Sequence, residues 1–89
     1  MLGSPMSAKG DHSEYIAFAR RILRAMARRI GDADPEDLAE MLALRDELDA
    51  AITNAVAGLR ENDYSWAEIA RATGTTRQAA FARWASKVA

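Results

Sequence analysis

Apolar residues recur every three or four positions over most of the chain, which is the spacing of one face of an α-helix. One such face spans residues 13–30 and a second spans residues 35–60. Nowhere do apolar and polar residues alternate as they do in a half-buried strand. The pattern therefore predicts two long helices. Their apolar positions are Tyr15, Phe18, Ala19, Ile22, Leu23, Met26 and Ile30 in the first segment, and Leu38, Met41, Leu42, Leu48, Ile52, Ala55, Val56 and Leu59 in the second.

The residues between these two segments predict where one helix ends and the next begins. Gly31 stands where a C-cap is expected, because glycine adopts positive φ without steric cost. Asp34 is a favourable N-cap, and Pro35 suits the first helical position. At about 1.5 Å per residue, a helix over residues 35–60 extends about 39 Å. The first helix can cover only part of that length, so the remainder needs the C-terminal helices or a second copy of the chain.

Two short helical patterns follow, separated by one glycine. Ser65 and Glu68 have the spacing of a capping box, which begins a helix from Trp66 to about Ala72. Gly74 supplies the turn. We expect Thr75 to cap the last helix, with Gln78 placed to complete a second capping box. Two capped helices joined by so short a turn predict a helix-turn-helix.

The predicted fold is all-α, with about four helices. A hairpin or dimerisation region over residues 13–60 precedes the helix-turn-helix over residues 64–88, within one helical domain over residues 13–89. Residues 6–12 are polar and unpatterned, and residues 1–5 resemble a remnant of cloning, so residues 1–12 are expected to form a flexible arm.

The segment WAEIARATGTTRQAAFARW, residues 66–84, resembles the helix-turn-helix of sigma-factor region 4 and of small actinobacterial or phage regulators. Two positions depart from that family. Thr75 replaces an apolar residue, and Ala80 replaces a larger core residue whose space Trp84 could fill. The positions that carry the resemblance are Ile69, Ala70, Gly74, Thr76 and Trp84.

The resemblance implies that the last helix enters the major groove of double-stranded DNA, led by its N-terminal residues. Ala80, Trp84 and Val88 would then face the core, and Ala85 would share the outer side with the base contacts. Two alternatives stay open: Gln78 only closes a capping box, and Phe81 packs in the core. Trp66 and Trp84 are expected in the core. The implied base contacts are Arg77, Gln78, Phe81 and Thr76, and the implied phosphate contacts are Ser65, Arg71, Thr75, Arg83 and Lys87.

Charge is segregated along the chain although its formal net value is only −1. Residues 14–31 and 64–89 are net basic, whereas residues 32–63 are strongly acidic. Such segregation can produce a basic face on a nearly neutral protein. A stripe of arginines in the first helix could add phosphate contacts, pair with the acids of the second helix or remain solvated. Its members are Arg20, Arg24 and Arg28.

The composition argues against an enzyme. The chain has no cysteine and a single histidine, and it shows neither a nucleophile–base arrangement nor a glycine-rich phosphate loop. We expect no metal, cofactor or membrane span, and a cytoplasmic location. The expected function is sequence-specific DNA binding by a small transcriptional regulator that dimerises through its second helix. The alternative is a non-catalytic interaction module, such as an antitoxin-like protein, an anti-repressor or an RNA polymerase adaptor, that uses that acidic helix to bind a protein.

Overall fold

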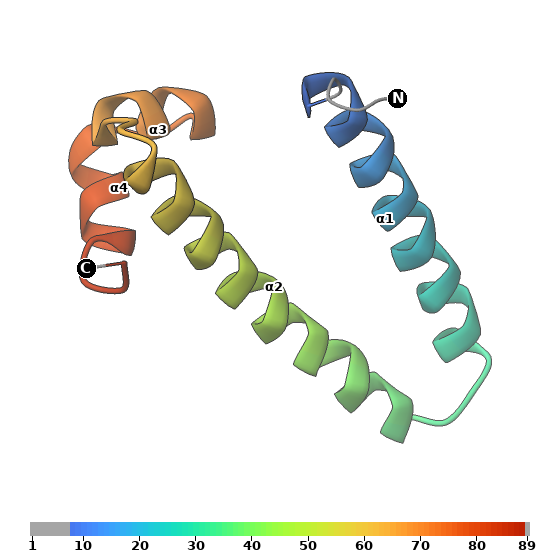
Figure 1. Ribbon diagram of the computed structural model, residues 1–89. Helices are drawn as coiled ribbons and strands as arrows, with labels where there is room; N and C mark the ends of the chain where they lie inside the picture. Colours follow the sequence, from blue (N-terminus) through green and yellow to red (C-terminus); the bar gives the residue numbers. More distant parts are fainter. Residues whose placement is uncertain (1–7, 89) are drawn as a thin grey trace. The chain divides into compact units, whose positions relative to one another are not determined.

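The computed structural model describes residues 8–88 and confirms an all-helical fold (Figure 1). Two long helices precede two short ones: α1 (Ala8–Gly31), α2 (Glu36–Glu61), α3 (Trp66–Thr73) and α4 (Arg77–Trp84). Residues 8–88 contain no strand. Among the helices of this range, none is both long and apolar enough to cross a bilayer. The chain divides into two compact units, Met1–Leu42 and Ala43–Ala89, which we describe separately.

In the N-terminal unit, α1 begins earlier than the sequence predicts. The helix starts at Ala8 rather than near Ser13, so residues 8–12 are helical instead of part of a loose arm. The rest of the predicted arm, with the predicted remnant at residues 1–5, lies outside the described residues. Gly31 is the last helical residue, and its φ is not positive, so the predicted glycine C-cap is wrong. Asp32 and Ala33 instead continue with i→i−3 backbone bonds.

Most of the large apolar residues of α1 are exposed, whereas Met26 and Ile30 are half-buried. Tyr15 is 77% exposed, and Ile16, Phe18, Ile22 and Leu23 are each about half exposed. The arginines of the predicted stripe are exposed as well, and at about 100° per residue they fall opposite the apolar positions. Arg21 lies over the ring of Phe18, with Cζ 5.6 Å from the centroid. The described part of this unit thus leaves an amphipathic helix whose apolar side is mostly uncovered.

α2 begins one residue later than predicted, at Glu36. The N–H of Asp37 donates to the carbonyl of Asp34, and that of Leu38 donates to Pro35, each at 3.0 Å. These i→i−3 bonds form a tight first turn around the proline. Glu36 and Asp37 lie in that first turn, where negative charge interacts favourably with the helix dipole.

The C-terminal end of α2 is closed by a residue that the sequence pattern did not single out. Asp63 has φ 70°, in the left-handed region. The N–H of Tyr64 donates to the carbonyl of Leu59 at 3.1 Å, and that of Asp63 donates to Arg60 at 3.0 Å. This pair of bonds is a Schellman motif, which usually has glycine at the left-handed position. The motif turns the chain from α2 directly into α3.

The core of the C-terminal unit is small and joins three helices. α2 contributes a single buried residue, Val56. Against it pack residues of α3 and α4, with Ala85 and Val88 partly buried at the margin. The predicted core positions of Trp66 and Trp84 are confirmed. The buried set is Val56, Trp66, Ile69, Ala70, Ala80 and Trp84.

Candidate nucleic-acid interface

The capping box at the start of α3 forms as the sequence predicts. The N–H of Glu68 donates to the Ser65 hydroxyl at 3.0 Å, and the N–H of Ser65 donates to the Glu68 carboxylate at 2.8 Å. Hydrogen bonds from the backbone N–H and then the side chain of Ser65 hold the pKa of Glu68 below its ordinary value of 4.5, with Arg71 adding a smaller favourable charge. The half-buried Ser65 hydroxyl therefore accepts a hydrogen bond within the cap.

Gly74 forms the turn between α3 and α4. Its φ is 71°, in the left-handed region. The N–H of Thr75 donates to the carbonyl of Ala70 at 2.9 Å, and that of Gly74 donates to Arg71 at 3.4 Å. This is the same Schellman pattern that ends α2. Within 4 Å of a Cβ placed on Gly74 there is no atom, so its conformation rather than its size calls for glycine.

α4 is capped by Thr76 and not, as predicted, by Thr75. The Thr76 hydroxyl accepts a hydrogen bond from the N–H of Ala79 at 3.0 Å. The third helical residue is therefore Ala79, so Gln78 is out of register for a capping box and the second predicted box does not form. Thr75 is exposed and precedes the cap. Gln78 is exposed too, and its amide has no part in the helix cap.

The predicted faces of α4 are partly right. Ala80 and Trp84 are buried and Val88 is half-buried, as expected. Ala85 was expected on the outer side, but it packs against the core. Successive residues advance about 100° around a helix. Counted from Ala80 and Trp84, the position that points directly away from the core is Ala82.

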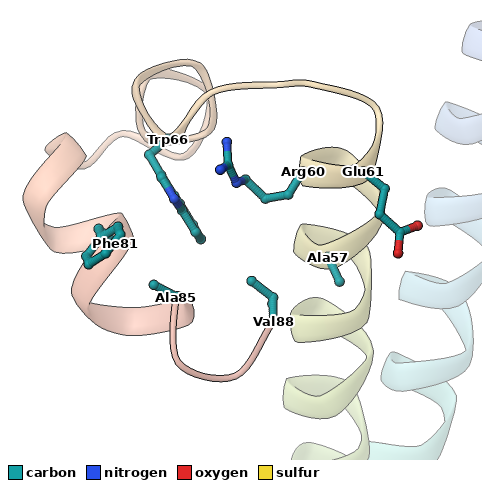
Figure 2. Close-up of a pocket in the computed structure, with 7 residues that line it drawn as sticks. All are labelled: Ala57, Arg60, Glu61, Trp66, Phe81, Ala85 and Val88. Atoms are coloured by element: carbon teal, nitrogen blue, oxygen red, sulfur yellow. The ribbon is translucent and has the colours of Figure 1, made fainter.

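Phe81 lies at the edge of the core, beside α3. Its ring meets that of Trp66 edge-on, with centroids 5.7 Å apart and planes at 77°. The side chain is 51% exposed and borders an open hollow of about 440 Å³, shown in Figure 2. Phe81 therefore packs against Trp66 of α3 at the margin of the core and stays half exposed. By helical spacing, Phe81 lies about 100° around α4 from Ala82, at the side of the outward face and not at its centre.

The hollow lies within the C-terminal unit and is lined in part by the rings of Trp66 and Phe81. Arg60 crosses it from the last turn of α2, as Figure 2 shows. Its Cζ lies 5.0 Å from the centroid of a Trp66 ring, and its Nη1 donates to the carbonyl of Tyr64 at 2.9 Å. The other residues lining the hollow are Ala57, Glu61, Ala85 and Val88.

The outward face of α4 is short and carries mostly small side chains. Gln78, Ala79 and Ala82 are exposed. By helical spacing, Gln78 and Ala79 lie on either side of Ala82. Arg77, the first helical residue, is exposed one turn before Phe81 and lies on the same side of α4 as Phe81, about 140° around the axis from Ala82. Sequence reasoning missed Ala79 and Ala82, although counting 100° steps from Ala80 would have found them.

Three cations belong to the same compact unit as this face. Arg71 lies in the last turn of α3, Arg83 lies in the last turn of α4, and Lys87 follows that helix; all three are exposed. Arg83 lies over the ring of Trp84, with Cζ 5.3 Å from the ring centroid. In the part of the chain that the structure describes, no group of histidine or carboxylate side chains is arranged to hold a metal ion.

Comparisons with known proteins give no match: no family model, curated protein or solved structure is similar to this chain.

Proposed function

We propose that the chain binds double-stranded DNA sequence-specifically, with α4 in the major groove. The observation that carries the proposal is the outward face of α4: one free amide, Gln78, beside two small residues, Ala79 and Ala82. A capped helix held by a left-handed glycine turn presents this face rigidly. A helix with a small outer face can approach the floor of a groove closely, where base edges are accessible.

Gln78 is the principal base-reading residue in this proposal. A glutamine amide can donate to N7 and accept from the N6 amino group of adenine in a bidentate pair. Gln78 lies in the first turn of α4, which is the part of a recognition helix that reaches base edges. Arg77 and Thr76 stand beside it at the start of the helix and contact the neighbouring base pair or its phosphate.

Phosphate contacts come from the cations around α4. Arg71, Arg83 and Lys87 are exposed and belong to the same compact unit as the reading face. The exposed Thr75 hydroxyl can donate to a phosphate oxygen just ahead of the helix. Each phosphate neutralised releases counterions, so binding must weaken as salt rises.

The biological role that fits this chemistry is that of a small, non-catalytic transcriptional regulator acting in the cytoplasm as a homodimer. One helix of eight residues contacts few base pairs. Typical specific affinities need more contacts than one such helix provides, so two copies on an inverted repeat are expected. The exposed acidic residues of α2 repel phosphate, so that side of α2 would face away from the duplex.

A second candidate function is protein docking, which the exposed acids of α2 favour. Asp46, Glu47 and Asp49 are exposed and adjoin one another around the helix, so they could receive a basic partner. In that case the helix-turn-helix would serve as a scaffold and not as a DNA reader.

Equilibrium binding to a mixed-sequence duplex at two salt concentrations separates these candidates. The proposal predicts retention at low salt that falls steeply at moderate salt. A variant with Arg71, Arg83 and Lys87 all changed to alanine should lose most of that retention. A matched variant with Asp46→Asn, Glu47→Gln and Asp49→Asn should retain the duplex at least as well as the wild type. No retention of any duplex by the wild type would favour protein docking.

A further inference from the structure

The C-terminal half of α2 has two apolar faces, and the C-terminal unit covers only one of them. Val56 is buried against α3 and α4. Leu48, Ile52 and Leu59 are 55%, 39% and 40% exposed. At about 100° per residue, these three and Ala55 gather on one side of the helix. That side lies about 120° from the middle of the face made by Thr53, Val56 and Ala57, so α3 and α4 do not reach it.

The uncovered side has the spacing of a coiled-coil seam. Leu48, Ile52, Ala55 and Leu59 are separated by four, three and four residues, which is the a/d pattern of a heptad repeat. Arg45 precedes Leu48 by three residues and so occupies the next seam position toward the N-terminus. A seam of period 3.5 keeps facing a second helix of the same kind along its length. The partner that this pattern fits is a helix with the same repeat.

We propose that this seam pairs with the same seam of a second copy of the chain, and that the two α2 helices run antiparallel. The inference specifies the interface of the homodimer in the proposed function, and it does not depend on DNA binding. The seam is defined by Arg45, Leu48, Ile52, Ala55 and Leu59.

Arg45 decides the direction of the pairing. In a parallel pair, identical seam positions lie side by side, so Arg45 would face Arg45 of the second copy. Two like charges opposed in this way are unfavourable. In an antiparallel pair the two arginines lie at opposite ends of the seam. A single polar residue at a seam position is a known means of fixing the register and direction of such a pair.

The antiparallel register follows from matching apolar layers. Antiparallel seams bring each a position against a d position, which places Leu48 against Leu59 of the second copy and Ile52 against Ala55 of the second copy. Continued by one layer, this register places Arg45 opposite Asn62 of the second copy, whose amide oxygen can accept a hydrogen bond from the guanidinium. By two-fold symmetry the same pair forms at the other end. Every large apolar residue of the seam is covered in this register.

Charge along α2 favours the same direction. Asp46, Glu47 and Asp49 lie toward the N-terminal side of the seam, whereas residues 50–60 carry no acid and one base, Arg60. Antiparallel helices set the acidic part of one copy beside the neutral and basic part of the other. Parallel helices would set the two acidic parts together.

Introduced thiols test the arrangement directly, since the chain has no cysteine of its own. Leu48→Cys is prepared with a size tag and mixed with untagged Leu59→Cys, and the mixture is unfolded, refolded and oxidised without DNA. Both residues are exposed in the single chain, so neither substitution empties the core. Ala50→Cys is the matched control, because Ala50 is exposed on the far side of α2.

The proposal predicts that the mixed 48–59 disulfide forms at least tenfold faster than either self-linked product. In the antiparallel register the two Leu48 positions are about 16 Å apart along the axis, beyond the reach of a disulfide. Preferred self-linkage of both variants would mean a parallel pair and would overturn the inference. So would a wild-type monomer in sedimentation equilibrium together with linkage no faster than that of Ala50→Cys. In that event the chain's own α1 or another protein covers the seam.

The result is independent of the DNA experiment. A monomer that retains duplex DNA in a salt-dependent manner would remove the interface and leave the DNA proposal standing. A dimer that shows the predicted linkage but retains no duplex would support the interface and remove the DNA proposal.

Discussion

The guanidinium of Arg60, in the last turn of α2, lies over the ring of Trp66, the first residue of α3, with Cζ 5.0 Å from the ring centroid. The same group donates to the carbonyl of Tyr64 in the connection between the two helices. A planar cation can stack on an indole and donate in its own plane at the same time. Arg60 therefore links the end of α2 to the base of the helix-turn-helix.

We predict that Arg60→Ala lowers the free energy of unfolding by about 1 kcal/mol, through the lost cation–π contact and the lost hydrogen bond. Arg60→Lys should recover only part of this loss, because an ammonium cannot stack as a plane. Urea unfolding monitored by the fluorescence of the two tryptophans measures the effect. Lys87→Ala, at an exposed position outside the helices, is the control with no expected change. Equal stability of the wild type and Arg60→Ala would mean that the stacking contributes nothing.

Replacing glycine by alanine should change stability in opposite directions at Gly74, which forms the turn, and at Gly58, which lies within α2. Gly74→Ala should destabilise the protein by about 1–2 kcal/mol, because alanine is strained at a φ of 71°. Gly58→Ala should instead stabilise it by about 0.5–1 kcal/mol, since Gly58 is helical and a Cβ there meets no atom within 4 Å. Thermal unfolding of both variants by circular dichroism checks the pair. Shifts of the same sign would rule out the left-handed turn as the reason for glycine at residue 74.

Asp63 offers a stabilising substitution. It is a non-glycine residue with φ 70°, at the negative end of the α2 dipole. Asp63→Gly relieves both the steric and the electrostatic cost and should add about 0.5–1 kcal/mol, or a few degrees in Tm. A lower Tm for Asp63→Gly would show that its carboxylate makes a compensating interaction.

Much of this architecture can be predicted from the sequence, because it is determined locally. The capping box of Ser65 and Glu68 and the left-handed Gly74 each depend on a few neighbouring residues, and both form as predicted. The choice between Thr75 and Thr76 as the cap of α4 could not be made, because either hydroxyl can accept the bond and the length of the turn decides. Asp63 was missed because aspartate is a less frequent left-handed residue than glycine.

Features that depend on contacts between helices were less predictable. The edge contact of Phe81 with Trp66 and the partial burial of Ala85 depend on how α4 rotates against α3 and α2. An apolar pattern alone does not state which side of a helix its neighbours cover. For the same reason, the pattern of α2 predicted a helix but not its division into a buried face at Val56 and an exposed seam.

The capping box predicts a specific dependence of stability on pH. The pKa of Glu68 is lowered in the folded protein, so its ionised form adds stability above the ordinary value of 4.5, and this is lost as pH falls through the lowered pKa. Glu68→Gln keeps an acceptor for the Ser65 N–H but does not titrate. The wild type should be the more stable at neutral pH, and its advantage should shrink below 4.5. Chemical unfolding at a series of pH values measures this difference. If the stability difference between the wild type and Glu68→Gln stayed constant in acid, the ionised Glu68 carboxylate would not be the source of the stabilisation.

Gln78 and Arg83 should affect DNA binding in different ways. Gln78→Ala should weaken binding to the preferred duplex by about 1–3 kcal/mol while leaving binding to mixed sequences unchanged. Arg83→Ala should weaken binding to all duplexes alike and reduce the slope of log affinity against log salt by about one. Fluorescence anisotropy titrations at several salt concentrations separate the two. Phe81→Leu, at the edge of the core, should leave sequence preference unchanged.

The central claim, that α4 reads DNA, is tested most directly by selection from a pool of random-sequence duplexes at low and moderate salt, followed by sequencing of the retained fraction. The account predicts enrichment of an inverted repeat whose half-sites contain adenine, retention that falls with salt, and loss of the enrichment in Gln78→Ala. Retention without enrichment would mean that the cations contact phosphates but that α4 reads no sequence. No retention at either salt concentration would contradict DNA binding itself.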